Sequence, residues 1–395
     1  MLNMQVNFKH RGYYPELFTL LPEDLQSELQ KLRIFFQEKT TRVYMVGGAV
    51  RDLIRIVLEK QPIDIIDLDI EVYGIKPKEF DALMHELGAK GVGKSFFVYK
   101  YKENIDLSLP RIESKIGKGH KAFAVELAKD EKSASIRRDF KMNALMLNIF
   151  TGELLDFWGG IEDIAHKRIS IIDEEKFKED SLRVLRAMQF SARFKYKIEK
   201  RSCEVMREIA LDDLSHERIF WEFEKMFKAS FLHFGLYAFT ALNIDQKLFG
   251  LRISRKNFFQ IAKEMMRNRI YFQEHLYKFE FLYILSMRLH KNVFRFLEVL
   301  QTPKEYYKAF KKQKAIPTYR SDRFLAGLAT NYPIKNWLGN YKQDVTIRAK
   351  KFGIWEEKFQ PVQAKELMQE GFFGAELGKE LRKRTLQIIR QRFAK

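Results

Sequence analysis

Two aspartates, Asp67 and Asp69, stand one residue apart in the segment "DLDIEVYG". Alternate side chains of a β-strand project from the same face, so the two carboxylates would lie side by side. Neighbouring carboxylates repel each other unless a cation lies between them, and carboxylate oxygens are ligands that suit Mg²⁺. The spacing therefore indicates a Mg²⁺ site, although an Asp-x-Asp pair alone would also fit a solvated strand edge.

A pair of glycines, Gly47 and Gly48, precedes these aspartates, between the apolar run "VYMV" and a stretch with helical spacing. Such a turn lets phosphate oxygens approach the backbone N–H groups at a helix N-terminus. Glycine pairs at strand ends are mostly plain turns. A strand, a Gly-Gly turn and a helix followed by an Asp-x-Asp strand nevertheless suggest nucleotidyl transfer, with a triphosphate at the turn. Asp106, in "NIDLSLPR", is a candidate third carboxylate, and a surface role fits it nearly as well.

The elements that would position these residues follow from the apolar pattern. "VYMV" is apolar and β-branched, which is typical of a buried strand, and residues 48–60 have helical spacing. Other elements are expected as helices at 21–38 and 76–87, strands at 67–74 and on both sides of 102–104, a loop through about Asp130, and a hairpin turning at Thr151 and Gly152. The first 160 residues are therefore predicted to form a small mixed sheet with flanking helices.

Beyond Gly160 the pattern is helical nearly to the end of the chain. Long helices are predicted over 174–194 and 215–230. The fold class is therefore α+β. Four regions are expected, namely 1–160, 161–230, 231–350 and 351–395.

The composition, with 46% hydrophobic and 31% charged residues, is that of a soluble globular protein. No apolar run approaches the roughly 18–20 residues that cross a bilayer, so no membrane association is expected. The single cysteine, Cys203, excludes an internal disulfide framework and a cysteine-based zinc site. The N-terminal segment lacks the apolar core of a secretion signal. We therefore expect a cytoplasmic protein, and no obligate protein partner is evident.

Positive charge is concentrated in the second part of the chain. Residues 251–395 hold 31 Lys and Arg against 13 Asp and Glu, whereas residues 1–250 hold 40 against 39. Clustered cations attract phosphates and release counterions on binding. The asymmetry favours a nucleic-acid partner over a merely solvated basic surface.

Five motifs, in order along residues 43–226, carry a resemblance to a known family. They are "GGAVRD" with "DLD", "RRDFKMNAL", "LLDFWGGIEDI", "EDSLRVLR" and "SHERIFWEF". The sequence resembles class II CCA-adding enzymes (tRNA nucleotidyltransferases), in the polymerase β-like superfamily that also holds bacterial poly(A) polymerases. The segment "PVQAKELMQEGFFGAELGKEL" is similar to the family's C-terminal tail. The resemblance implies a nucleotidyltransferase head followed by a helical nucleotide-reading neck, a tRNA-binding body and a tail.

The resemblance also implies roles for individual residues and the partners tRNA, CTP and ATP. Asp67 and Asp69 would bind two Mg²⁺ ions, with Asp106 as a third catalytic carboxylate. Gly47 and Gly48 would hold the triphosphate, with Arg51 and Asp52 supporting the turn, and Arg138, Asp139 and Asn143 would contact the sugar and phosphates of the nucleotide. Asp180 and Arg183 would read the base, with Glu179 and Arg186 bracing them. Glu217 and Arg218 would stabilise a helix.

The pair Asp180 and Arg183 can also be argued from its chemistry. The two residues lie three apart on a predicted helix, hence on one face. A carboxylate accepts from an exocyclic amino group, and a guanidinium donates to a ring nitrogen. Cytosine and adenine both offer an amino group beside a ring acceptor, whereas guanine and uracil offer a carbonyl beside a ring N–H. One Asp/Arg pair can thus accept CTP and ATP and refuse the other two, although an ordinary intrahelical salt bridge is the usual reading of this spacing.

Residues 110–135 resemble the family's flexible loop, which argues against an enzyme restricted to adding CC. His120 in this loop could be a ligand or base but is more often a bystander. Ser170 stands where many relatives have an arginine, and residues 231–345 match no motif. The alternatives are a poly(A) polymerase, a partial CC- or A-adding enzyme and, in another class, a non-catalytic RNA-binding protein.

Overall fold

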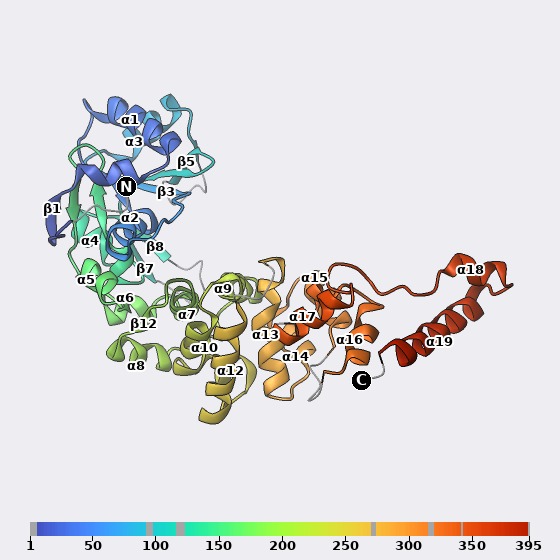
Figure 1. The fold of residues 1–395 in the computed structure, drawn as a ribbon. Coiled ribbons are helices and arrows are strands. Elements are labelled where there is room, and N and C mark those ends of the chain that lie inside the picture. Colours follow the sequence, from blue (N-terminus) through green and yellow to red (C-terminus); the bar gives the residue numbers. More distant parts are fainter. Residues whose placement is uncertain are drawn as a thin grey trace. The chain divides into compact units, whose positions relative to one another are not determined.

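The computed structural model describes residues 6–91, 98–115, 123–269, 274–314, 320–340 and 343–393. The chain divides into two compact units (Figure 1), one formed by residues 1–214 with 241–243 and the other by residues 215–240 with 244–395. The prediction of four regions remains a prediction.

The first unit is built on a mixed sheet with the strand order β1-β10-β9-β2-β3-β6-β5-β4. Its strands are β1 (Arg11–Tyr13), β2 (Val43–Val46), β3 (Leu68–Val72), β4 (Lys90–Gly91), β5 (Val98–Lys102), β6 (Ile105–Ser108), β9 (Met146–Asn148) and β10 (Glu153–Leu155). Strands β3 and β6 run parallel, and the other neighbouring pairs run antiparallel. The predicted mixed sheet and the α+β class are confirmed.

The centre of the sheet is buried because β2 is apolar on both faces and β3 is apolar on one face. All four residues of β2 are buried, as are Ile70 and Val72 of β3. The register pairs Val46 with Asp69 and Asp69 with Asp106. Since directly paired residues project from the same face, the two carboxylates share one face of the sheet.

The first unit also contains helices, which are α1 (Glu23–Phe36), α2 (Gly48–Glu59), α3 (Pro77–Glu86), α4 (Glu131–Ser135), α5 (Gly160–Ala165), α6 (Glu174–Lys178), α7 (Leu182–Phe194) and α8 (Lys200–Glu208). Of these, α2 packs on strands β2 and β3 of the sheet. Helix α1 buries Leu25, Leu29, Leu32 and Phe36, the three- and four-residue spacing of an amphipathic helix. The predicted helices at 21–38, 48–60 and 76–87 are confirmed with shorter bounds.

Two expectations are wrong. The segment expected as a loop contains the antiparallel strands β7 (Arg111–Lys115) and β8 (Phe123–Leu127), and residues between them, including His120, lie outside the described residues. The helix expected over 174–194 is two helices, because α6 ends at Lys178 and α7 begins at Leu182. The Asp180 carboxylate accepts the backbone N–H of Leu182 at 3.2 Å, and this local bond competes with a continuous helix. A short parallel pair, β11 (Arg168–Ile169) and β12 (Lys197–Ile198), was also not predicted.

The second unit is helical throughout its described part. Its helices are α9 (His216–Lys228), α10 (Leu232–Ala241), α11 (Ile244–Phe249), α12 (Arg255–Asn268), α13 (Tyr277–Arg288), α14 (Val293–Leu300), α15 (Lys304–Lys312), α16 (Asp322–Ala329), α17 (Gln343–Lys351), α18 (Ala364–Gln369) and α19 (Gly374–Arg392). Aromatic rings fill its core, such as the stacked pair Phe227 and Phe281 at 5.5 Å between ring centroids. A second cluster surrounds the fully buried Trp337.

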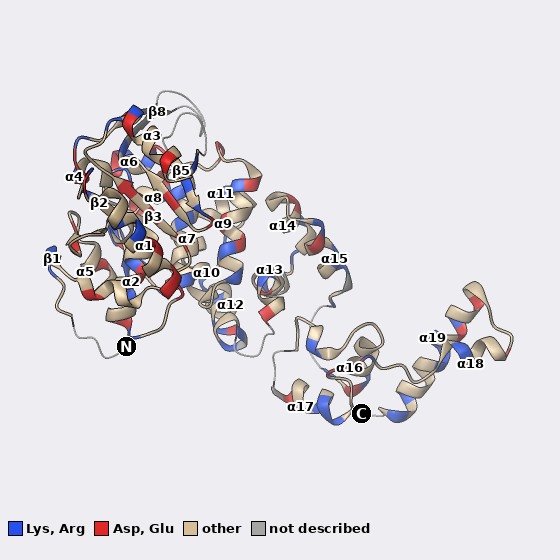
Figure 2. Cartoon of the chain, turned by 90° about the horizontal axis from the view of Figure 1, so that it is seen from above, with Lys and Arg blue, Asp and Glu red and all other residues tan. Residues whose placement is uncertain are grey.

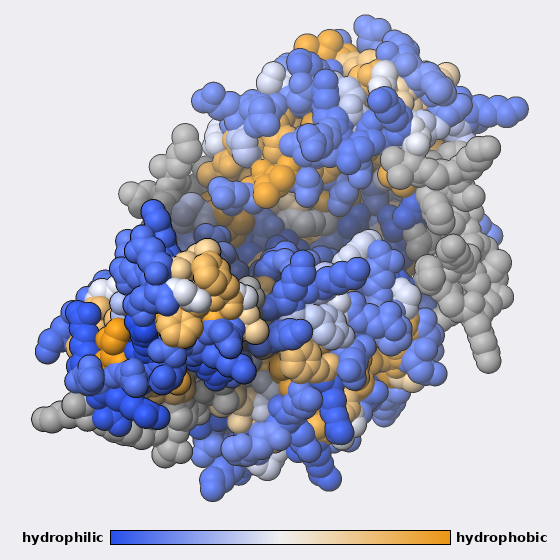
Figure 3. All heavy atoms as spheres, turned by 90° about the vertical axis from the view of Figure 1, so that its right-hand side faces the viewer, coloured by the Kyte–Doolittle hydropathy of each residue, from blue (hydrophilic) through white to orange (hydrophobic). Residues whose placement is uncertain are grey.

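The face drawn in Figure 3 is mostly hydrophilic, with separate apolar patches. Large exposed apolar side chains include Trp221, Phe259 and Phe373. Within the described ranges, no helix is both long and apolar enough to cross a membrane.

Candidate active site

Three candidate metal ligands lie at one end of strands β3 and β6. Asp69 and Asp106 are register partners on the same face, and Asp67 immediately precedes β3. Asp69 keeps an exposed edge, yet its pKa is raised, chiefly because the surrounding protein desolvates its carboxylate. The positive charge of Arg138 opposes this shift, and the negative charges of Asp106, Glu71 and Asp67 add to it. The sequence-predicted carboxylates are therefore close enough to repel one another.

The oxygen chemistry of this cluster fits a cation. The Oδ1 atom of Asp106 is buried and has no hydrogen-bond partner among the described residues. A buried carboxylate oxygen without a partner is costly, and a bound cation would remove that cost. In the described part of the chain, no three His, Cys, Asp or Glu side chains form a preformed cage. The fit to Mg²⁺ therefore rests on this oxygen and on the clustered negative charge.

The glycine turn lies against these carboxylates. Gly47 caps the N-terminus of α2 with a φ of 72°, a conformation that favours glycine. A Cβ atom on Gly47 would lie 2.8 Å from Nη1 of Arg138 and 3.7 Å from Oδ2 of Asp69. A helix N-terminus, a guanidinium and a carboxylate thus surround one turn, an arrangement that can hold a triphosphate with its cation.

A chain of hydrogen bonds begins at Arg51, in the first turn of the helix that follows the glycine turn. Arg51 is buried and donates to both oxygens of Asp52, at 3.0 and 2.7 Å, and to Oδ1 of Asn143 at 2.7 Å. Asn143 donates to Oδ1 of Asp139 at 2.8 Å, and Arg186 donates to Oδ2 of the same carboxylate at 2.7 Å. Four predicted site residues, Arg51, Asn143, Asp139 and Arg186, are therefore joined in one network.

Asp139 is fully enclosed by this network. Burial alone would raise its pKa, but the charge of Arg186 and the hydrogen bonds from Asn143 and Arg186 outweigh burial, and the net pKa is lowered. The carboxylate is therefore ionised and links Asn143 to Arg186 on α7 through hydrogen bonds. Asp139 and Asn143 are buried at 7% and 5% exposure, so in this structure they support the site more than they line it.

Glu71 is a site residue that the sequence analysis missed. It lies two residues after Asp69 on the same face of β3 and is 2% exposed. Arg137 and Arg138 each donate to it at 3.0 Å, and Tyr73 donates at 2.8 Å. Burial would raise its pKa, but the charges of the two arginines outweigh burial and the net pKa is lowered. The signal that could have found it is the two-residue period Asp67, Asp69, Glu71.

The proposed base-reading pair lies at the break between α6 and α7. Asp180 precedes α7, whereas Arg183 lies in its first turn, so the two do not share a regular helix. Arg183 donates from Nη1 to the carbonyl of Lys176 at 2.8 Å and from Nη2 to the carbonyl of Arg137 at 2.6 Å. A guanidinium carries five N–H groups, so these two bonds fix its plane and leave others to donate.

The remaining motif residues serve local structure. Asp156, in "LLDFWGGIEDI", accepts the backbone N–H groups of Gly159, Gly160 and Ile161 and so caps α5. Ser170 is buried and donates from its hydroxyl to Asp163 at 3.0 Å. In the second unit, Glu217 and Arg218 lie in the first turn of α9, where Ser215 accepts the N–H of Arg218.

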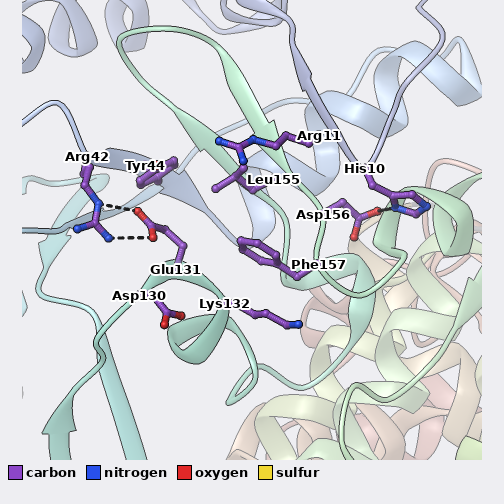
Figure 4. Close-up of a pocket in the computed structure, with 10 residues that line it drawn as sticks. All are labelled: His10, Arg11, Arg42, Tyr44, Asp130, Glu131, Lys132, Leu155, Asp156 and Phe157. Carbon is purple, nitrogen blue, oxygen red and sulfur yellow. Dashed lines mark hydrogen bonds and ion pairs between the residues drawn. The ribbon is translucent and has the colours of Figure 1, made fainter.

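The first unit also holds a cavity of about 590 Å³ that none of the predicted site residues lines (Figure 4). Tyr44, Leu155 and Phe157 supply its apolar lining. Its charged groups are largely paired: Arg42 donates twice to Glu131 at 2.9 Å, and His10 lies 3.3 Å from Asp156. The cavity has near-balanced charge and is separate from the candidate site.

Helix α12 in the second unit presents a basic face. Figure 2 shows blue segments on this helix. The exposed cations of α12 are Arg255, Lys256, Lys263 and Arg267, and the exposed Arg252 lies just before the helix. Two large apolar side chains lie among them, Phe259 with 58% exposure and Met266 with 54%. Arg255 lies 5.8 Å from the ring centroid of Phe259. Cations interleaved with an exposed ring are typical of surfaces that bind RNA.

Parts of the chain are similar in sequence to known proteins. Residues 43–170 match the family of the poly(A) polymerase head domain. The chain is 30% identical over 224 residues to the CCA-adding enzyme of Lactococcus lactis, covering 55% of this chain and 54% of that one. It is 36% identical over 198 residues to the multifunctional CCA protein of Stenotrophomonas maltophilia, covering 47% and 45%. The chain thus spans about half the length of these curated relatives.

Solved structures extend the similarity of the fold to nearly the whole chain. An apo form of a CCA-adding enzyme superposes with a TM-score of 0.68 at 17% identity, covering 97% of this chain and 96% of that one. The Thermotoga maritima CCA-adding enzyme complexed with tRNA-CCA gives 0.67 at 19% identity, covering 97% and 95%. Residues 43–170 thus match the poly(A) polymerase head domain, and the fold of nearly the whole chain is similar to that of CCA-adding enzymes.

Proposed function

We propose that this protein adds CCA to the 3′ end of tRNA from CTP and ATP, without a nucleic-acid template. The observation that carries the proposal is the position of Gly47 between Arg138 and Asp69 at the N-terminus of α2. Solved structures with this fold include the Bacillus stearothermophilus CCA-adding enzyme in complex with CTP and a CCA-adding enzyme complex with ATP.

In this reaction the tRNA 3′-oxygen attacks the α-phosphorus of the nucleotide. A bond forms between these two atoms, the bond from the α-phosphorus to the bridging oxygen breaks, and pyrophosphate leaves. Mg²⁺ held by Asp67 and Asp69, beside Asp106, would neutralise phosphate charge and favour the ionised 3′-hydroxyl. The backbone at Gly47 and Gly48 and the guanidinium of Arg138 would bind the triphosphate. Catalysis is then mainly positioning and charge neutralisation.

Base selection is assigned to Asp180 and Arg183. The two carbonyl contacts of Arg183 support this role because they hold the guanidinium in one plane before a nucleotide arrives. A chain of hydrogen bonds would connect this base-selecting pair to the triphosphate turn through Arg51, Asn143, Asp139 and Arg186. The protein itself would then serve as the template.

The second unit is proposed to hold tRNA through its phosphates. Its excess of positive charge and the basic face of α12 support this role. Affinity supplied by phosphate contacts falls as salt rises, because binding releases counterions.

One experiment separates this function from its alternatives. tRNA transcripts ending at the discriminator base, at C or at CC are incubated with each nucleotide separately, and the new 3′ ends are sequenced. CCA addition predicts C, C and A in turn on the three transcripts. Extension of any RNA with ATP alone would indicate a poly(A) polymerase, and CC alone or A alone a partial enzyme. Binding of tRNA without any incorporation would indicate a non-catalytic RNA-binding protein.

A further inference from the structure

The carboxylate of Glu71 lies in the interior of the head, where a charged group is destabilising unless it has hydrogen-bond partners. Its carboxylate is buried in the sheet, and transferring a charge from water into protein is unfavourable without partners. Its Oε1 atom accepts from Nη2 of Arg137 and from Nη2 of Arg138, and its Oε2 atom accepts from the hydroxyl of Tyr73. Two charged donors and one neutral donor therefore converge on a single carboxylate.

The contact with Arg138 fixes the guanidinium at the glycine turn. Nη2 of Arg138 is bound to Glu71, and Nη1 lies 2.8 Å from the Cβ position of Gly47. One end of the guanidinium is thus anchored in the sheet, and the other faces the turn beside Asp69. A guanidinium held at one end presents its other donors in a defined direction.

The contact with Arg137 reaches the other half of the site. The side chain of Arg137 is bound to Glu71, and its backbone carbonyl accepts from Nη2 of Arg183 at 2.6 Å. The dipeptide Arg137–Arg138 therefore links one carboxylate on β3 to both the triphosphate turn and the base-reading arginine.

We propose that Glu71 is a positioning residue that sets the geometry of Arg138 at the triphosphate and of Arg183 at the base. The inference rests on the proposed function and deepens it. The role of Glu71 differs from the metal-binding role proposed for Asp67 and Asp69, because the contacts of Glu71 are with arginines and a tyrosine. Its loss should therefore weaken nucleotide binding and base selection together, while tRNA affinity stays the same.

The test uses the full-length protein with Glu71→Gln, which keeps the side-chain shape and removes the charge. We expect the KM for CTP and for ATP to rise about 10-fold, as for loss of a charged hydrogen bond, and incorporation of UTP relative to CTP to rise several-fold. Binding of CTP to the protein without tRNA should weaken by a similar factor, and the Kd for tRNA should not change. Glu131→Gln is the matched control, because Glu131 also accepts two hydrogen bonds from an arginine but lines the separate cavity.

A double-mutant cycle tests whether Glu71 acts through Arg138. In an Arg138→Ala background, Glu71→Gln should change the KM for CTP by less than about 2-fold, because the arginine that Glu71 positions at the triphosphate is gone. Tyr73→Phe, which removes the neutral donor and keeps both arginine contacts, should give a smaller change in KM than Glu71→Gln and serves if the latter does not fold.

The outcomes separate this inference from the proposed function. Wild-type protein that incorporates no nucleotide would overturn the proposed function and this inference with it. Active wild-type protein whose Glu71→Gln variant loses thermal stability but keeps its KM, CTP affinity and base selection would overturn the inference alone. An undiminished KM effect in the Arg138→Ala background would overturn the link to Arg138.

Discussion

Arg138 lies directly beside Gly47, with Nη1 only 2.8 Å from the position that a Cβ atom on Gly47 would occupy. Glycine is thus required at this turn both by its backbone conformation and by the arginine packed against it. The two requirements coincide where the triphosphate is proposed to bind.

Gly47→Ala should therefore damage the turn in two ways. The positive φ costs about 1–3 kcal/mol for a residue with a Cβ, and the methyl group displaces Arg138. We expect a lower melting temperature and a KM for CTP and ATP raised by at least about 10-fold. Gly48→Ala is the comparison for stability, because a Cβ there would meet Arg51 at 3.6 Å, an ordinary contact. Equal melting temperatures for the two variants would contradict the account of Gly47.

Asp67→Ala and Asp69→Ala should each abolish nucleotide addition. Loss of a metal ligand removes several kcal/mol of charge stabilisation, on the order of a 1,000-fold fall in kcat. Circular dichroism and tRNA affinity should stay close to wild type. Asp64→Ala, an exposed residue in the same segment, is the control. Near-normal kcat in either test variant would remove that aspartate from the proposed metal site.

Asp180→Ala and Arg183→Ala should make base selection less strict. Each variant leaves one edge of the base without its partner, which should cost about 1–3 kcal/mol of discrimination. Arg183→Ala should be the more severe, because it also leaves the carbonyls of Lys176 and Arg137 without their donor. Incorporation of all four nucleotides onto tRNA lacking CCA measures the effect. If both variants still reject UTP and GTP as wild type does, the base is read elsewhere.

The basic face of α12 offers a direct test of tRNA binding. Reversing three charges, Lys256→Glu, Lys263→Glu and Arg267→Glu, should weaken tRNA binding by at least about 10-fold in low salt. The slope of log K against log salt should become shallower by about 0.9 for each phosphate that the variant no longer neutralises. The same reversal at the exposed Lys76, Lys78 and Lys90 of the head is the control. A similar loss of affinity in both triple variants would show only a general charge effect.

Stability should depend on the ionised Asp139. Its pKa in the folded protein lies below its ordinary value of 3.8, so the unfolded chain takes up the proton first as the pH falls. The stabilisation is therefore fully present well above pH 4 and is lost as the pH falls through the folded-state pKa. Asp139→Asn should lower the free energy of unfolding at pH 7 by about 1–3 kcal/mol.

Urea denaturation at pH 7 and near pH 3.5 checks this expectation. The difference between wild type and Asp139→Asn should shrink at the lower pH. A difference that is the same at both pH values would show that the carboxylate charge does not contribute.

The elements at the centre of the head could be predicted from the sequence, because the patterns that indicate them are local. The apolar strand β2, the glycine turn and α2 follow one another without interruption, so their periodicity predicts both the elements and their order. The two-residue spacing of Asp67 and Asp69 likewise predicts their placement at one end of β3.

Two features that the sequence did not predict, β1 and the contacts of Glu71, depend on partners far along the chain. Strand β1 forms because Arg11 pairs with Leu155 of β10. Glu71 finds its partners at Arg137 and Arg138, which no local pattern connects to β3. The break between α6 and α7 depends on one side-chain bond at Asp180 that competes with helical hydrogen bonding. The secondary-structure propensities of the residues do not predict any of these contacts.

The two edges of the sheet in the head have a consequence for its solubility. Strand β1 has three residues and β4 has two, and Arg11 and Lys90 place charge on them. Long, flat, apolar edges recruit strands from other molecules, whereas short charged edges offer too few free backbone groups to do so. In the described part of the head, an open sheet is therefore protected against edge-to-edge aggregation by the brevity and charge of its outermost strands.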